Sequence, residues 1–199
     1  MQMGYYLGVK DFGAVGDGVT NDTAALQAAI DAAAECGKTL LVEPGRYRTD
    51  VLYIKSRIAM KADPTWDYGS EGRCVFLPLT DTQKCVLNLN EAFGSTLEGF
   101  CVSGERRGKD MCGLLIDRGE FVREDTFRLE KLKVMGFSGH AVNLECIWCF
   151  SMRHCMLAFS GGDGLHIRGW DCFILDNWFS GNDGAGYGTD GVNASVTMT

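Results

Sequence analysis

Three copies of one pattern decide the fold: Phe127-Arg-Leu-Glu-Lys-Leu132, Phe150-Ser-Met-Arg-His-Cys155 and Phe173-Ile-Leu-Asp-Asn-Trp178. The copies begin 23 residues apart, and the same register continues to Val196 and Met198. A fixed period of this length indicates a stacked repeat, in which each copy forms one coil of a solenoid. We therefore expect three columns that pass through the core: Phe127, Phe150 and Phe173; Leu129, Met152 and Leu175; Leu132, Cys155 and Trp178.

Apolar and polar side chains alternate inside the repeat. Val142 and Leu144 enclose Asn143, and Glu145 follows them. Alternation with period two predicts β-strands that face a core on one side. Leucine-rich repeats have a similar period, but their L-x-x-L-x-L-x-x-N pattern is absent from this sequence. The sequence therefore predicts an all-β fold, a parallel β-helix.

A different segment precedes the repeat. Apolar residues at helical spacing between Ala25 and Ala33 predict one amphipathic helix over residues 23–36. Asn21 or Asp22 is expected to cap its start, and Gly37 to follow its end. Short strands separated by charged or Gly-rich loops come next. We expect one domain over residues 1–199, with an N-terminal segment and helix (1–38), irregular coils (39–126) and regular 23-residue coils (127–199).

Charge and composition limit the classes of partner and the locations that fit this chain. The net charge of −7 and the pI near 4.9 argue against nucleic acid as a partner, although an acidic protein can still bind an acidic polymer through a local basic strip. No apolar run approaches the ~20 residues of a membrane span. Residues 1–10 are too short and too mixed for a secretory signal. We expect a cytoplasmic or virion location, or a secreted one if a leader has been removed. The nine cysteines are expected to be free thiols.

Two N-terminal motifs resemble the opening of the pectate-lyase-like superfamily: Val9-Lys-Asp-Phe-Gly-Ala-Val-Gly-Asp-Gly-Val-Thr-Asn-Asp-Thr23 and Leu41-Val-Glu-Pro-Gly-Arg-Tyr47. This superfamily includes glycoside hydrolase family 28 relatives, family 55 glucanases and many phage tail spikes. The resemblance implies a single-stranded, right-handed parallel β-helix whose first coil is capped by the N-terminal helix. It also implies carbohydrate polymers as substrates. Because members are usually longer, we expect residues 1–199 to be a fragment truncated on its C-terminal side.

The glycines before the helix do not predict a phosphate site. Gly13 to Gly18 have the spacing GxxGxG instead of GxGxxG, and we expect them to form a turn. Asp17, Asn21 and Asp22 lack the spacing of a calcium loop. Helix capping is their expected role, so no metal site is predicted.

Outward-facing residues of the repeat predict a binding surface. Because coils stack about 4.8 Å apart, residues one period apart form columns. Asp163 is expected to border two of these columns. The columns are Asn143, His166 and Thr189, and beside it Glu145, Arg168 and Gly191.

Two reactions fit this surface. Glycoside hydrolysis requires two carboxyl groups, which Glu145 with Asp163, or Asp163 with Asp183, would supply. A lyase instead requires a base, His166 or Arg168, that removes a proton next to a uronate carboxylate while calcium or another cation neutralises the charge. Calcium is expected only in this lyase alternative. The candidate catalytic residues are Glu145, Asp163, His166, Arg168 and Asp183.

Tryptophans and the remaining histidines complete the candidate residues. An exposed indole can stack on a sugar ring, so Trp148 and Trp170 join Asn143 as candidate substrate-binding residues. Trp178 is expected in the core. His140 and His154 are expected at the surface or in turns.

The preferred function is polysaccharide degradation, by a glycoside hydrolase before a lyase, with the glycan along the outer face of the β-helix. One alternative is a phage tail-spike module that recognises a glycan as a homotrimer. Another is a fragment that binds glycan without catalysis. No nucleic-acid or membrane partner is expected.

Overall fold

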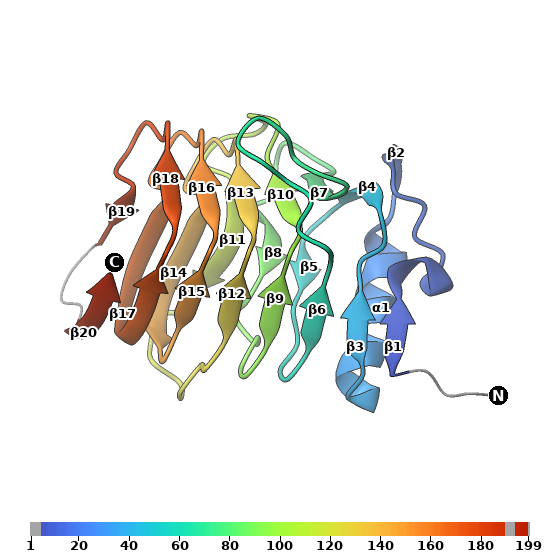
Figure 1. Cartoon of the computed structure of the whole chain (residues 1–199), viewed down its shortest axis with the longest axis horizontal. Helices are drawn as coiled ribbons and strands as arrows, with labels where there is room; N and C mark the ends of the chain where they lie inside the picture. The colour runs from blue at the N-terminus through green and yellow to red at the C-terminus, as the bar shows by residue number, and fades with distance from the viewer. Residues whose placement is uncertain (1–4, 190–193, 199) are drawn as a thin grey trace.

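The computed structural model describes residues 5–189 and 194–198, and it is a parallel β-helix, as the repeat predicts (Figure 1). Every strand pair within these residues is parallel. The strands form three ladders that run along the axis of the coils. Each coil from β3 (Thr39–Leu41) to β14 (Val142–Trp148) contributes one strand to each ladder, whereas the first coil has the helix α1 (Thr23–Cys36) in place of its third strand.

The ladders differ in where they lie along each coil. Ladder 1 contains β1 (Tyr6–Gly8), β3 (Thr39–Leu41), β6 (Ala59–Lys61), β9 (Thr96–Glu98), β12 (Arg128–Glu130) and β15 (Ser151–Arg153). Ladder 2 contains β5 (Leu52–Tyr53), β8 (Cys85–Asn88), β11 (Cys112–Asp117) and β14 (Val142–Trp148). Ladder 3 contains β2 (Asp17–Asn21), β4 (Gly45–Thr49), β7 (Cys74–Pro78), β10 (Cys101–Ser103), β13 (Lys133–Met135), β16 (Met156–Ala158) and β18 (Trp178–Ser180).

One long strand, β17 (Leu165–Leu175), joins ladders 1 and 2. Its first half pairs with β14 and its second half with β15. Two further strands, β19 (Tyr187–Gly188) and β20 (Ala194–Met198), pair with its other edge.

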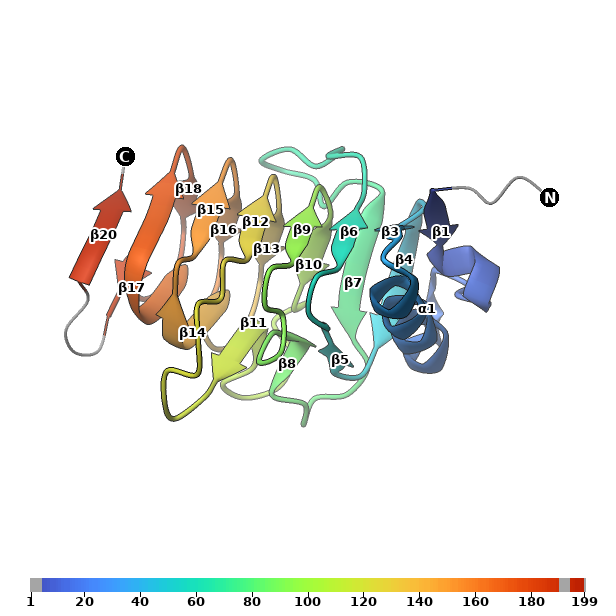
Figure 2. The ribbon, with the colours of Figure 1, turned by 90° about the horizontal axis from the view of Figure 1, so that it is seen from below.

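The helix α1 (Thr23–Cys36) lies beside β1 and β3 at the N-terminal end of the coils (Figures 1 and 2), after a 3-10 turn (Val9–Phe12). Its apolar stripe buries Leu26, Ala29, Ile30 and Ala33. Gly37 ends it with φ of 67°, a left-handed conformation that suits glycine. No helix of the described residues is long and apolar enough to cross a membrane.

The predicted N-cap position of the helix is confirmed, but the side-chain contact is not. Asp22 holds the N-cap position, but its side chain makes no capping hydrogen bond. Its buried carboxylate instead accepts hydrogen bonds from the backbone N–H groups of Val15 and Gly16, at 2.7 and 3.0 Å. Asp22 therefore fixes the glycine-rich turn that precedes the helix.

The interior is one continuous apolar cluster with stacked aromatic rings along its axis. The rings of Phe76 and Phe100 have centroids 5.1 Å apart, and those of Phe127 and Phe150 are 4.9 Å apart. Such pairs add about 0.5–1.5 kcal/mol each beyond the burial of their area. All nine cysteines are free thiols, and all except Cys36 and Cys149 are buried.

A β-bulge breaks the 23-residue register in β14. Glu145 pairs with Arg168, 23 residues later, but Ile147 pairs with Gly169, 22 residues later. The additional residue in β14 is Cys146, which has φ of 57°. A bulge leaves one residue without a partner in the ladder, so every pairing after it moves by one position.

The shift makes the predicted columns wrong in the third copy. Phe173 is 52% exposed and pairs with Ser151, so Cys172 takes the interior place next to Phe150. Ile174, in place of Leu175, pairs with Met152.

The third column is wrong for the same reason. Trp178 pairs with Met156 instead of with Cys155. Alternate residues of a strand face opposite sides, and Trp178 accordingly lies 57% exposed, outside the predicted core.

The last pairings also depart from a period of 23. His166 pairs with Gly188 instead of with Thr189, and the predicted partner of Arg168, Gly191, lies outside the described residues. Val196 and Met198 pair with Cys172 and Ile174, which lie 24 residues before them. The strand pairings within residues 127–189 and 194–198 are therefore less regular than predicted.

The segment between β6 and β7, residues 62–73, crosses the outer side of ladder 3 (Figure 1). Lys133 on β13 is fully buried beneath it, and its Nζ donates hydrogen bonds to the carbonyl oxygens of Asp67, Tyr68 and Ser70 at 2.8–3.0 Å. Trp66 Nε1 donates a further bond to the Lys131 carbonyl at 2.7 Å. These bonds hold the segment against the coils.

Candidate functional site

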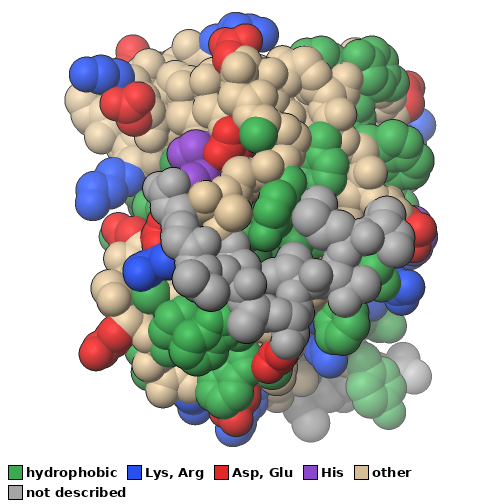
Figure 3. Space-filling model, turned by 90° about the vertical axis from the view of Figure 1, so that its left-hand side faces the viewer, with side chains coloured by type: hydrophobic (Ala, Val, Ile, Leu, Met, Phe, Trp, Pro, Cys, Tyr) green, Lys and Arg blue, Asp and Glu red, His purple; other side chains and the backbone are tan. Residues whose placement is uncertain are grey.

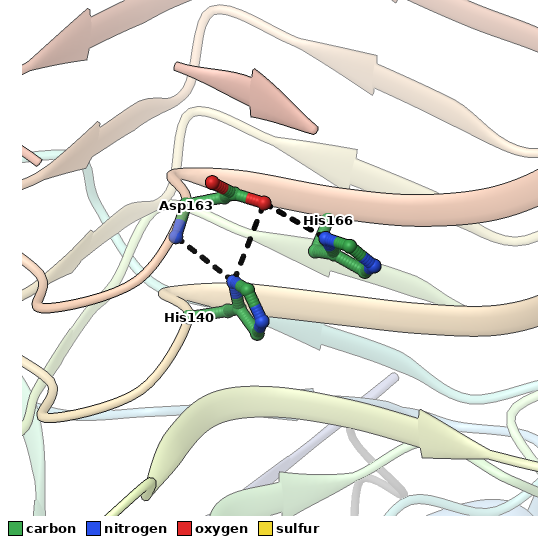
Figure 4. Close-up of side chains that lie close together, drawn as sticks. All are labelled: His140, Asp163 and His166. Carbon is green, nitrogen blue, oxygen red and sulfur yellow. Dashed lines mark hydrogen bonds and ion pairs between the residues drawn. The ribbon is translucent and has the colours of Figure 1, made fainter. Parts of the chain in front are cut away.

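Three side chains from two adjacent coils meet at the start of ladder 2: His140, Asp163 and His166 (Figure 4). His140 precedes β14, Asp163 lies in the equivalent turn before β17, and His166 is on β17. Close stacking of the turns requires glycine at position 162, since a Cβ there would lie 2.8 Å from His140 Nδ1. Histidine side chains reach the surface at this end of the molecule, next to acidic groups (Figure 3).

Hydrogen bonds fix the tautomers of both imidazoles. The Asp163 backbone N–H donates to His140 Nδ1 at 2.8 Å, so this nitrogen carries no proton. His166 Nδ1 lies 2.8 Å from Asp163 Oδ2. Because a carboxylate only accepts, we assign the proton to His166 Nδ1, which leaves Nε2 as its basic nitrogen. A carboxylate that orients an imidazole in this way is an arrangement for accepting a proton.

Asp163 is held as a carboxylate. Its other oxygen, Oδ1, accepts the backbone N–H of Ala185 at 2.8 Å. Partial burial acts to raise the pKa of Asp163, but the hydrogen bonds from His166 and Ala185 and the nearby imidazoles outweigh it, so the pKa lies below its ordinary value of 3.8. Asp163 is therefore suited to position His166 and poorly suited to act as an acid.

The lowered pKa predicts a specific acid response. A carboxyl group whose pKa is lower in the folded state stabilises the fold above its unfolded pKa, and this stabilisation is lost as the pH falls through the folded pKa. We expect Asp163→Asn to lower the unfolding free energy at pH 7, and the wild-type and variant curves to converge as the pH falls below about 4. Urea unfolding at a series of pH values measures this. Two curves that stay parallel down to pH 2 would contradict it.

Glu145 and Arg168 form an ion pair beside the histidines, as their predicted column implies. Arg168 Nε donates to Glu145 Oε2 at 2.8 Å, and this contact raises the pKa of Arg168. Arg168 Nη2 also lies 2.9 Å from Cys146 Sγ at the bulge. Asn143 pairs with His166 in the register, and its buried Oδ1 has no hydrogen-bond partner among the described residues.

Trp148 and Trp170 lie apart from this cluster, whereas Asp183 belongs to the turn that stacks on the Asp163 turn in the next coil. Asp183 is exposed in a turn after β18. Trp148 and Trp170 pair with each other at the far end of the β14–β17 ladder. Trp148 Nε1 donates to Asp171 at 3.0 Å, and Trp170, which is 41% exposed, stacks on Phe121 with ring centroids 4.3 Å apart.

Sequence reasoning missed His140, which was expected to be a surface or turn residue. Its imidazole faces His166, with ring centroids 4.5 Å apart, and it accepts a bond from Asp163. A signal was present, because His140 precedes Asp163 by one period of 23 residues, like Gly139 and Gly162.

The same three residues are the described group that could hold a metal ion. Their Nδ1 and carboxylate atoms lie within 4.8 Å of one another. Two imidazoles and a carboxylate would suit a transition metal better than calcium, which prefers oxygen ligands. Both Nδ1 atoms are, however, already in hydrogen bonds with Asp163, which a metal would have to replace.

A family model described as "Rhamnogalacturonase A/epimerase, pectate lyase-like" matches residues 6–69. The predicted resemblance is confirmed. Among curated relatives, the chain is similar to depolymerase 1 of Klebsiella phage K5-2, specific for capsule K30/K69, with 29% identity over 99% of the chain and 26% of that protein. It is also 66% identical over 41 residues to the mannuronan C5-epimerase AlgE5 of Azotobacter vinelandii, which covers 20% of the chain and 4% of that protein.

Solved structures share the fold of this chain. The A-module of the Azotobacter vinelandii mannuronan C-5 epimerase AlgE4 superposes with a TM-score of 0.79 and 24% identity, covering 97% of the chain and 55% of the module. The tailspike gp49 of Acinetobacter baumannii bacteriophage Fri1, a capsular polysaccharide depolymerase, gives 0.68 and 12%, covering 89% and 35%. The chain thus spans about a quarter of the phage relative and about half of the epimerase module.

Proposed function

We propose that this chain binds an acidic glycan along the outer side of ladder 2 and that His166 removes a proton from it. The observation that carries the proposal is the 2.8 Å contact between His166 Nδ1 and Asp163, which leaves Nε2 as the base. Arg168 follows His166 on the same side of β17 and places a cation beside it.

The proton most suited to this base is the one on the carbon that carries a uronate carboxylate. His166 Nε2 takes this proton, and the electron pair moves into the carboxylate, which then has enediolate character. Arg168 stabilises that added negative charge. If the pair then expels the neighbouring glycosidic oxygen, which takes a proton from solvent water, an unsaturated sugar forms; if water instead delivers a proton to the other side of the carbon, that carbon is inverted. Relatives that match short stretches of the chain carry both activities in their names, mannuronan C5-epimerase and alginate lyase.

Proton abstraction is better supported than the hydrolysis that the sequence favoured. Hydrolysis requires one carboxyl group that stays protonated until it donates to the leaving oxygen, and such groups have a raised pKa. The pKa of Asp163 is lowered instead, Glu145 is paired with Arg168, and Asp183 lies in an exposed turn. None of the three has the environment of a general acid.

A tail-spike role is the second candidate function, because the phage depolymerase matches along 99% of the chain. In that role the same surface would recognise a capsular glycan, with the chain as part of a homotrimer. Sedimentation of the purified chain tests the trimer independently of catalysis.

Product analysis in deuterated water tests the proposed reaction. We expect oligomannuronate or oligogalacturonate to gain deuterium at the carbon next to the carboxylate, or to yield an unsaturated end that absorbs ultraviolet light. A capsular polysaccharide serves as the comparison substrate. New reducing ends without unsaturation or deuterium at that carbon would show hydrolysis and overturn the proposal.

A further inference from the structure

Three arginines gather around Phe93 at a corner of the coils, away from the histidine cluster. The Arg123 guanidinium lies 4.0 Å from the centroid of the Phe93 ring, and that of Arg118 lies 5.1 Å from it. Arg57 lines the same pocket, whose volume is about 380 Å³. We call the group of Arg57, Phe93 and Arg123 the arginine pocket.

The arginine pocket is built from three successive connections, β5–β6, β8–β9 and β11–β12 (Figure 2). Backbone bonds hold them in register: Arg57 N–H donates to the Phe93 carbonyl at 2.8 Å, and Gly94 N–H donates to the Asp125 carbonyl at 2.6 Å. These connections follow the C-terminal ends of ladder 2 strands, whereas the histidine cluster lies at the N-terminal ends of β14 and β17. The two sites are therefore separate.

The arginine pocket carries more positive charge than the carboxylates near it neutralise. Asp125 is buried beneath the pocket. Its carboxylate forms an ion pair with Arg118 at 2.5 Å and accepts a hydrogen bond from the Trp148 backbone N–H at 2.8 Å. Even so, Nε and Nη1 of Arg118, whose side chain is 9% exposed, have no hydrogen-bond partner among the described residues. Glu124 also lines the pocket. Within residues 5–189 and 194–198, no carboxylate lies within 4.0 Å of the guanidinium groups of Arg57 and Arg123.

Arg57 and Arg123 thus lie beside an aromatic ring without a carboxylate partner among the described residues, although the chain has a net charge of −7. A planar guanidinium that lies over the Phe93 ring contacts it through its face, so its edge N–H groups stay available for an oxyanion. Guanidinium and carboxylate or sulfate groups form paired, charge-assisted hydrogen bonds. Local charge complementarity thus points to an anionic partner, although the protein as a whole is acidic.

We propose that the arginine pocket binds the carboxylate or sulfate group of an acidic glycan, at a distance from the reacting sugar. The choice of a glycan as carrier of this anion rests on the proposed function; the anion preference rests on the arginines alone. A polymer that fills both sites would be held at two points along the coils.

Calorimetric titration tests the pocket without turnover if it is performed in a His166→Gln background. The probes are oligomannuronate, a sulfated oligosaccharide and a neutral cello-oligosaccharide. We expect the two acidic probes, or one of them, to bind with an affinity that falls with added salt. Arg57→Asn and Arg123→Gln should each weaken this binding about tenfold or more, since a lost charge-assisted bond has that effect. Asparagine is chosen at position 57 because φ there is 60°.

Arg153→Gln, an exposed arginine on β15, is the matched control and should leave the dissociation constant unchanged. Melting curves verify that both pocket variants fold like this control. Three results would overturn the proposed anion binding at the pocket. They are equal affinities in the pocket variants and the control, a neutral probe that binds as tightly as the acidic ones, and no binding of either acidic probe. Loss of the predicted reaction with intact anion binding would instead refute the proposed function alone.

Discussion

Replacement of His166 by glutamine is expected to lower kcat on an acidic glycan by about 10²-fold or more, with KM little changed. Glutamine keeps a polar group near Asp163 but offers no basic nitrogen at physiological pH. A positioned base typically contributes a factor of about 10²–10⁴ to the rate. Steady-state kinetics of the unsaturated or deuterated product measures the effect.

The matched control is His154→Asn. His154 is half-exposed after β15 and has φ of 53°, which asparagine tolerates well. This variant should keep the wild-type rate. If His166→Gln is as active as His154→Asn, His166 is not the base.

Removing the Lys133 ammonium group should give the largest loss of stability. Lys133→Met retains the aliphatic side chain but leaves three carbonyl oxygens, those of Asp67, Tyr68 and Ser70, without their donor. Each buried acceptor that loses its partner costs about 1–3 kcal/mol of unfolding free energy. Because water can reach part of this outer segment, we expect the three carbonyl groups together to cost roughly 3 kcal/mol. The melting temperature should fall by roughly 6–12 °C for a chain of this size.

Limited proteolysis provides a second measurement for Lys133→Met. Cleavage should appear within residues 62–73, because the bonds that hold this segment against ladder 3 are lost. Lys84→Met, at a side chain that is 80% exposed, is the control and should show neither change. A Lys133→Met variant with wild-type melting and no new cleavage would show that the segment is held by its other contacts.

Much of the fold could be predicted because its causes are local and periodic. The 23-residue spacing indicated stacked coils, and the helix over residues 23–36 has the predicted bounds. The register after β14 could not be predicted. Its cause is one backbone conformation at Cys146, and cysteine gives no sign of a left-handed turn as glycine would.

The candidate site was predicted in part for the same reason. Columns before the bulge placed Asn143 opposite His166 and Glu145 opposite Arg168, as the structure has them. His140 was missed because it lies in a turn, where alternation says nothing about direction. Phe173 and Trp178 were assigned to the wrong side, since an error of one residue exchanges inside and outside.

The bulge at Cys146 also shows how a solenoid can change its surface chemistry through the length of a coil. Phe127 and Phe150 of the repeat fill the axis, whereas the corresponding Phe173 of the shifted coil faces solvent and a small thiol takes its place inside. A gain or loss of one residue thus alters a whole row of exposed groups while the axis continues. Related coils could acquire new glycan preferences by insertions and deletions at such positions, with few substitutions in the core.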